Sequence, residues 1–99
     1  MPAEVRLDPA AEQEARAAFV WYLERNAAVA EAFEAEFTHA ISAVASEPRR
    51  WPRLTARIRR YVFPRYPFSL IYVANNDVID ILAVAHHRRK PGYWRSRER

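Results

Sequence analysis

Several residue types are missing or scarce in this chain, and each absence excludes a class of site. The 99 residues include no cysteine, which excludes disulfides and thiolate metal sites. The only glycine is Gly92, so the chain has no glycine-rich phosphate loop. No apolar run reaches the roughly 18 residues that span a bilayer, and the N-terminus has no signal-peptide pattern. We therefore expect one cytoplasmic domain, residues 1–99, with no membrane contact.

Charge is also missing from particular stretches. No Asp or Glu occurs between Glu47 and Asp77, so this segment has no catalytic carboxylate pair. Residues 1–48 carry nine acids and three bases, a net charge of −6, whereas residues 49–99 carry thirteen bases and three acids, a net charge of +10. Such an asymmetry predicts a partner that is acidic or polyanionic, without predicting the fold.

The N-terminal half has a helical period. Residues 3–7 alternate weakly, which predicts a short edge strand. Asp8 and Pro9 then form a helix start, because Asp caps free amides and Pro tolerates the first helical position. Apolar residues at helical spacing predict helices from Pro9 to about residue 25 and from about residue 28 to residue 45. Asn26 is expected to end the first helix through a left-handed conformation, which makes the two helices an antiparallel hairpin.

The C-terminal half has a strand period. Residues 58–63, 68–73 and 78–86 are rich in β-branched and aromatic residues. The three residues 75–77 between the last two runs predict a tight hairpin. The predicted fold class is therefore α+β: two layers in the order β-α-α-β-β-β, with a helical hairpin on one face of a mostly antiparallel sheet.

The first of these three strands alternates in a way that separates its two faces. Arg57, Arg59 and Tyr61 share one face, whereas Ile58 and Val62 share the other. We expect the apolar face to meet the helices and the arginine face to form a cationic floor. A solvent-facing sheet surface is polar in any case, so this floor need not be functional.

Two adjacent histidines end the last strand. His86 and His87 point to opposite faces, so at most one joins a given site. A histidine transfers protons near neutral pH. No third ligand occurs at a recognised spacing, so we expect no metal and no cofactor. A polar strand end is the plain alternative.

A basic tail, residues 88–99, follows that strand and mixes cations with Tyr93 and Trp94. This composition suits nucleic acid, through phosphate contacts and stacking, or an acidic protein surface that Arg, Tyr and Trp anchor. Alternatively, one aromatic side chain folds back and covers the sheet. The residues expected to bind a partner are Arg57, Arg59, Arg88, Arg89, Tyr93, Trp94 and Arg95.

At this point the chain resembles the RelE/ParE superfamily of type II toxin–antitoxin toxins. The resemblance covers essentially the whole chain. It is carried by the element order and by four segments: Asp8-Pro-Ala-Ala-Glu12, Trp21-Tyr-Leu-Glu24, Arg65-Tyr-Pro-Phe-Ser-Leu-Ile-Tyr72 and Ile81-Leu-Ala-Val-Ala-His-His-Arg-Arg-Lys-Pro-Gly-Tyr-Trp94. The superfamily implies a toxin that a cognate antitoxin, an acidic and partly disordered chain, binds and neutralises in a hetero-oligomer.

The resemblance implies two different activities. RelE-like toxins cleave mRNA on the ribosome, whereas ParE-like toxins poison DNA gyrase without a known catalytic site of their own. In the first case the matching catalytic positions are Arg59, Arg65, His86, His87 and Tyr93. Residues 48–76 hold no lysine or carboxylate, and a guanidinium is a poor base, so only a histidine could accept a proton. We therefore favour the ParE-like, non-enzymatic branch, with a metal-independent endoribonuclease as the first alternative and a basic nucleic-acid-binding module as the second.

Overall fold

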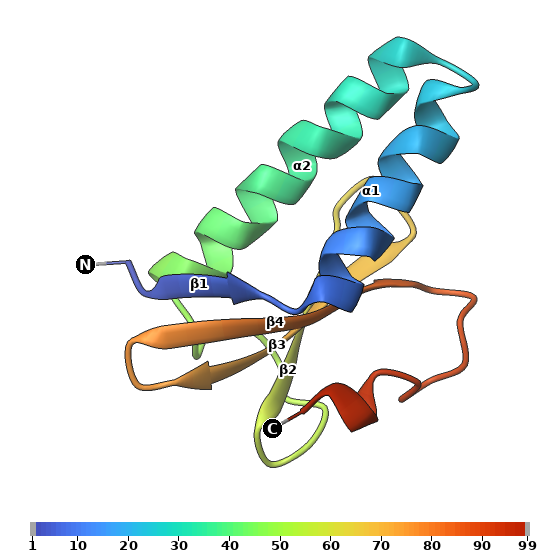
Figure 1. The fold of residues 1–99 in the computed structure, drawn as a ribbon. Helices are drawn as coiled ribbons and strands as arrows, with labels where there is room; N and C mark the ends of the chain where they lie inside the picture. Colours follow the sequence, from blue (N-terminus) through green and yellow to red (C-terminus); the bar gives the residue numbers. More distant parts are fainter. Residues whose placement is uncertain (1, 99) are drawn as a thin grey trace.

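The computed structural model describes residues 2–98, and its elements follow the predicted order (Figure 1). The two helices pack on one face of a four-stranded sheet, which confirms the α+β prediction. Within residues 2–98, neither helix has the length and apolarity of a membrane span. The elements are β1 (Glu4–Leu7), α1 (Pro9–Leu23), α2 (Ala27–Ser46), β2 (Ile58–Val62), β3 (Phe68–Asn75), β4 (Val78–His86) and the 3₁₀ helix η1 (Arg95–Arg97).

The sheet has the order β1-β4-β3-β2, with β2, β3 and β4 antiparallel and β1 parallel to β4. As predicted, β1 is an edge strand. Asn76 turns the chain between β3 and β4 with a φ of 51°, which asparagine tolerates. Ile81 pairs with Tyr72 and Ala83 with Ile71, so Leu82 has no partner in β3 and forms a β-bulge.

Local capping explains where the helices begin. The Asp8 carboxylate accepts a hydrogen bond from the Ala10 amide at 2.8 Å, as predicted for the start of α1. The prediction for Asn26 was wrong in its mechanism. Asn26 has an extended conformation, with a φ of −163°, and its side chain accepts from the amides of Ala28 and Val29. It is the N-cap of α2, and the short connection still produces the helical hairpin.

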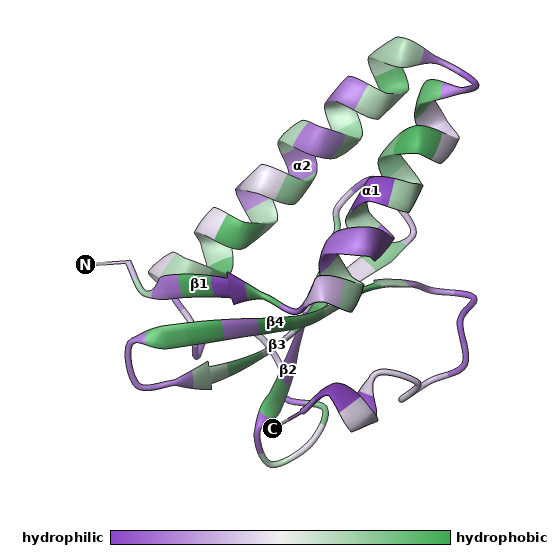
Figure 2. Cartoon of the chain, in the orientation of Figure 1, coloured by the Kyte–Doolittle hydropathy of each residue, from purple (hydrophilic) through white to green (hydrophobic). Residues whose placement is uncertain are grey.

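The main core lies between the helices and the inner face of the sheet. Phe33 of α2 packs among Tyr22, Phe63, Tyr66 and Phe68, with ring centroids 5.3–6.0 Å apart. Small helix residues let the helices approach the sheet closely; Ala11, Ala18 and Ala40 are buried. Figure 2 shows β4 as mostly apolar.

A second apolar cluster covers the outer face of the sheet. Ile58, Ile71, Val73 and Leu82 contribute to it, and Trp94 of the C-terminal segment closes over them. Trp94 is 6% exposed, which confirms the alternative that one tail aromatic folds back onto the sheet. Both faces of the sheet are therefore covered, the inner face by helices and the outer face by the end of the chain (Figure 1).

Because the tail covers the outer face of the sheet, the two faces of β2 point the opposite way from the prediction. Tyr61 lies in the core with the helices, whereas Ile58 packs in the outer cluster and Val62 is exposed. The Arg59 guanidinium also turns inward, where its Nη1 atom donates to the carbonyls of Arg49 and Trp51 at 3.0 and 2.7 Å. The predicted cationic floor of Arg57, Arg59 and Tyr61 was therefore wrong, because aromatic Tyr61 filled the helix-facing core in place of Ile58.

Candidate functional site: a basic groove beside the C-terminal tail

The C-terminal tail, here residues 88–98, returns across the outer face of the sheet and ends in η1 (Figure 1). Backbone hydrogen bonds hold the start of the tail: the amide of His87, just before it, donates to the Pro67 carbonyl, and the Arg89 amide donates to the His86 carbonyl. Trp94 then fixes the middle of the tail in the outer cluster. The tail is thus a second layer on the sheet.

Glu14 of α1 anchors the other side of this tail. Its carboxylate accepts from the Tyr93 hydroxyl at 2.6 Å, from Arg97 at 2.9 and 3.2 Å, and from the Val84 amide at 3.0 Å. The Glu14 side chain is only 16% exposed and that of Arg97 19%. One carboxylate therefore joins α1, β4 and the tail in a partly buried, charge-assisted network.

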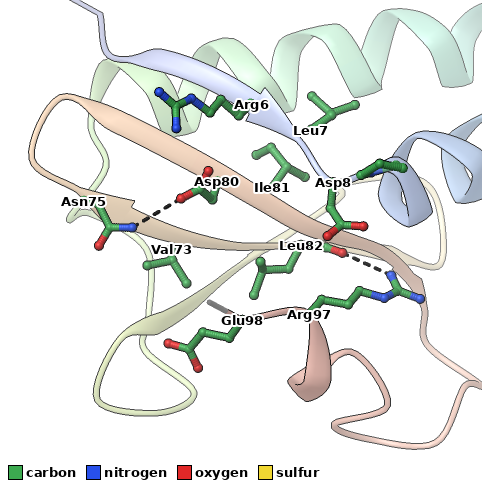
Figure 3. Close-up of a pocket in the computed structure, with 11 residues that line it drawn as sticks. Arg6, Leu7, Asp8, Val73, Asn75, Asp80, Ile81, Leu82, Arg97 and Glu98 are labelled. Atoms are coloured by element: carbon green, nitrogen blue, oxygen red, sulfur yellow. Dashed lines mark hydrogen bonds between the residues drawn. The ribbon is translucent and has the colours of Figure 1, made fainter.

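The network also supplies hydrogen-bond partners to the part of β4 that β1 does not reach. The strand β1 pairs with β4 only as far as Ile81, and beyond it the Val84 amide and Leu82 carbonyl lack a neighbouring strand. Glu14 accepts from the first of these groups, and Arg97 donates to the second at 3.0 Å. Figure 3 shows the Arg97 guanidinium directed to the Leu82 carbonyl, with Glu98 next to Arg97 in the tail. These residues line a cavity of about 360 Å³.

A groove of about 440 Å³ lies between the outer face of the sheet and the tail; we call it the tail groove. Its sheet side carries Arg60, Val62 and Ser69, and its tail side runs from Arg89 to Arg95. Four lining residues are permanent cations, and none is a carboxylate: Arg60, Arg89, Lys90 and Arg95 supply the charge. The tail groove is therefore a consistently basic hollow.

The two histidines make different contacts, but both line the tail groove, so the prediction that at most one of them joins a given site was wrong. The His86 ring packs edge-on against Phe68, and burial, with additional effects from Arg88 and His87, lowers its pKa below the usual range. His87 lies in the tail groove, where its Nε2 atom is 2.9 Å from the Ser69 hydroxyl. His87 is thus the histidine of the pair whose ring is held by the floor of the groove.

The structure scatters the other predicted site residues. Arg57 donates to Asn75 at 2.8 Å and pairs with Glu98 at 3.4 Å, so it supports the tail. Arg65 forms an ion pair with the buried Glu36 of α2 at 3.0 Å, and its amide also donates to that carboxylate. The positions Arg59, Arg65, His87 and Tyr93 therefore do not converge on one point.

Two residues important for this site were not among the predicted site residues. Arg60 lies in the tail groove, and alternation with Ile58 and Val62 would have placed it on that face. Glu14 gave no sequence signal, because its partners are 70 to 83 residues away along the chain. Within residues 2–98, no three His, Asp or Glu side chains gather as a metal site.

Tyr93 gives the tail a measurable pH dependence. Burial and the hydrogen bond to Glu14 raise its pKa to about 12, from about 10 in an unfolded chain. Between pH 10 and 12 the unfolded chain loses this proton while the folded chain keeps it, so the free energy of unfolding should fall over that window. In urea titrations from pH 9 to 12, Tyr93→Phe should show a shallower fall than the parent chain. Some fall should persist because burial also raises the pKa of Tyr72 to about 12. Equal slopes for the two proteins would contradict this prediction.

Comparison with known proteins now places the chain. The family model described as ParE toxin of type II toxin-antitoxin system, parDE, matches residues 5–91. The chain belongs to the ParE toxin family. A solved structure described as the chromosomal ParDE toxin–antitoxin system from P. aeruginosa has the same fold, with a TM-score of 0.72. That match covers 85% of this chain and 95% of the other at 16% identity. No curated protein matches significantly.

The match to the ParE toxin family covers only part of the tail groove. It includes Glu14 and the sheet, and it ends at residue 91, before Tyr93, Trp94 and Arg97. Residues 5–91 therefore include the sheet side of the tail groove, and the tail side of the groove continues beyond them.

Proposed function

We propose that this ParE-family toxin inhibits DNA gyrase and that a cognate antitoxin neutralises it in a toxin–antitoxin complex. The observation that carries the proposal is the match to the ParE toxin model over residues 5–91. The geometry described above supports the non-enzymatic branch of the superfamily, because three of the five predicted catalytic residues, Arg59, Arg65 and Tyr93, are engaged in other contacts.

The contacts of the predicted catalytic side chains argue against RNA cleavage. Metal-independent RNA cleavage needs a base, an acid and cations around one phosphate. Arg59 is bonded to backbone carbonyls and Arg65 to Glu36, so neither is directed to a phosphate beside His87. The Tyr93 hydroxyl donates to Glu14, and its raised pKa makes it a poor acid near neutral pH. Of the predicted catalytic residues, the two histidines are then the remaining proton-transfer groups beside the groove.

Two features of the surface support an acidic antitoxin that also has apolar side chains. The half of the chain after residue 48 carries a net charge of +10, which speeds the approach of an acidic segment. Between α1 and the tail, a hollow of about 580 Å³ is lined largely by apolar groups, including Trp21, Tyr22 and Phe68. Trp21 is 51% exposed there, so an apolar partner would bury it.

Gyrase inhibition can be tested directly with the purified full-length toxin. We expect the toxin to stop ATP-dependent supercoiling of relaxed plasmid by gyrase and to increase the cleaved plasmid trapped in the enzyme–DNA complex. Relaxation of the same plasmid by a type I topoisomerase, as the control, should be unaffected. Prior incubation with the antitoxin should restore supercoiling.

Two results would contradict the proposal. Unchanged supercoiling at a several-fold excess of folded toxin over gyrase would reject the target. Codon-specific mRNA cleavage on translating ribosomes, without any effect on gyrase, would support the endonuclease alternative instead.

A further inference from the structure

We propose that the tail groove binds single-stranded nucleic acid through its phosphodiester backbone, an activity separate from the action on gyrase. The evidence is the arrangement of cations, hydrogen-bonding side chains and an apolar floor within one hollow. The cations and the hydrogen-bonding side chains match the phosphate of a nucleotide, and the apolar floor matches its sugar or base.

Three of the four cations of the groove are not neutralised by the protein itself. Within residues 2–98, Arg60, Lys90 and Arg95 form no ion pair. Arg89 is 4.0 Å from Glu14, which lies on the other side of the tail. Positive charges around one hollow repel each other, and a bound polyanion relieves that repulsion.

Two further hydrogen-bonding groups line the groove, the Ser69 hydroxyl and the His87 ring. The Ser69 hydroxyl, on a residue that is 2% exposed, contacts the ring of His87, which is exposed in the groove. A hydroxyl and an imidazole both donate to phosphate oxygens, as arginine forks do with better geometry. The groove therefore offers a hydroxyl and an imidazole, as well as cations, for a phosphodiester.

The chain's single glycine helps to hold one of the cations in place. Gly92 has a φ of +79°, and a Cβ atom at this position would lie 2.9 Å from Nε of Arg95. Any other residue would be strained in this conformation and would displace the Arg95 side chain. Gly92 thus lets the guanidinium of Arg95 pack against the tail on the groove.

The apolar floor favours a single strand over a duplex. Leu54 and Val62 are 41% and 49% exposed, and both line the groove with Ile71. A duplex hides its base faces, whereas a single strand can bring sugars and bases onto an apolar floor. An acidic peptide is the competing occupant, and the experiment below separates the two.

Fluorescence anisotropy with the full-length toxin and a labelled 12-nucleotide DNA tests the proposal without gyrase. The logarithm of the affinity should fall with the logarithm of salt concentration with a slope of roughly −2 to −3, since three to four cations meet phosphates. RNA of the same sequence and a 12-base-pair duplex serve as parallel probes. Tighter binding of DNA or of RNA identifies the source of the strand, and the duplex should bind more weakly than either.

Charge-matched variants test whether the nucleic acid binds in the tail groove. Arg60→Gln with Arg95→Gln should weaken binding by about tenfold or more and should flatten the salt slope. The control, Arg16→Gln with Arg25→Gln, removes the same charge from the exposed surface of α1 and its following turn, and should change affinity by less than about twofold. Circular dichroism melting of both proteins confirms that each is folded.

Three outcomes would overturn the inference. The first is no binding to either single strand in low salt. The second is an equal loss in the groove and control variants, which would indicate general charge attraction only. The third is tighter binding of a glutamate-rich peptide that displaces the DNA and shows the same sensitivity to Arg60 and Arg95, which would make the groove a peptide site. Because gyrase is absent, failure here leaves the gyrase proposal untouched.

Discussion

Replacement of Glu14 by alanine is expected to lower the free energy of unfolding by about 3 kcal/mol, with a fall in Tm of roughly 15 °C. The substitution leaves the Arg97 charge without its partner and removes the acceptor for the Tyr93 hydroxyl and the Val84 amide. Breaking a fully buried ion pair costs about 3 to 5 kcal/mol. Glu14 and Arg97 are 16% and 19% exposed, so the lower end of that range applies.

The helix itself provides a control for this prediction. Glu12 pairs with Arg16 on the same helix, but both side chains are more than 60% exposed. Glu12→Ala should therefore change the unfolding free energy by no more than about 0.5 kcal/mol in urea titration. Glu14→Gln should be intermediate, because an amide oxygen still accepts from Val84 while the charge on Arg97 is left unbalanced. Similar stabilities of Glu14→Ala and Glu12→Ala would show that the carboxylate does not hold the tail.

Trp94→Ala should destabilise the protein by a comparable amount, about 3 to 5 kcal/mol. Trp94 is 6% exposed and closes the outer cluster over Ile58, Ile71 and Leu82, so its removal uncovers that face of the sheet. Trp21→Ala is the matched control. Trp21 is 51% exposed, and its loss should cost about 1 kcal/mol or less.

The two tryptophan substitutions should also differ in their effect on antitoxin binding. Trp21→Ala should weaken antitoxin binding while the toxin remains folded, because this ring lies open beside the apolar hollow. Trp94→Ala should first lower Tm, measured by circular dichroism, and affect binding only through the tail. An unchanged Tm with lost binding in Trp94→Ala would instead make that residue a partner anchor.

These substitutions concern one physical arrangement, a tail held between a carboxylate and an apolar cluster. Glu14 fixes it from the side of α1, and Trp94 fixes it from the outer face of the sheet. The tail forms one wall of the tail groove, so loosening either anchor should also disorganise Lys90 and Arg95. Nucleic-acid binding by Glu14→Ala should consequently fall even though Glu14 does not line the groove.

Local patterns in the sequence were sufficient to predict the helices and strands of this fold. The Asp8 cap, the helical spacing in residues 9–46 and the strand period after residue 58 depend on neighbours within a few residues, so the sequence alone predicts them. The hairpin at Asn76 follows for the same reason. The charge asymmetry between the two halves is likewise a property of the sequence.

Only the tertiary structure decided which side of each strand faces which layer. Alternation separated Ile58 from Tyr61, but both side chains are buried, one under the tail and one under the helices, so the period could not assign them. Arg59 was drawn inward by backbone carbonyls that have no side-chain signature. Glu14 meets Val84 and Arg97 across 70 and 83 residues, and contacts of that separation exist only once the chain has folded.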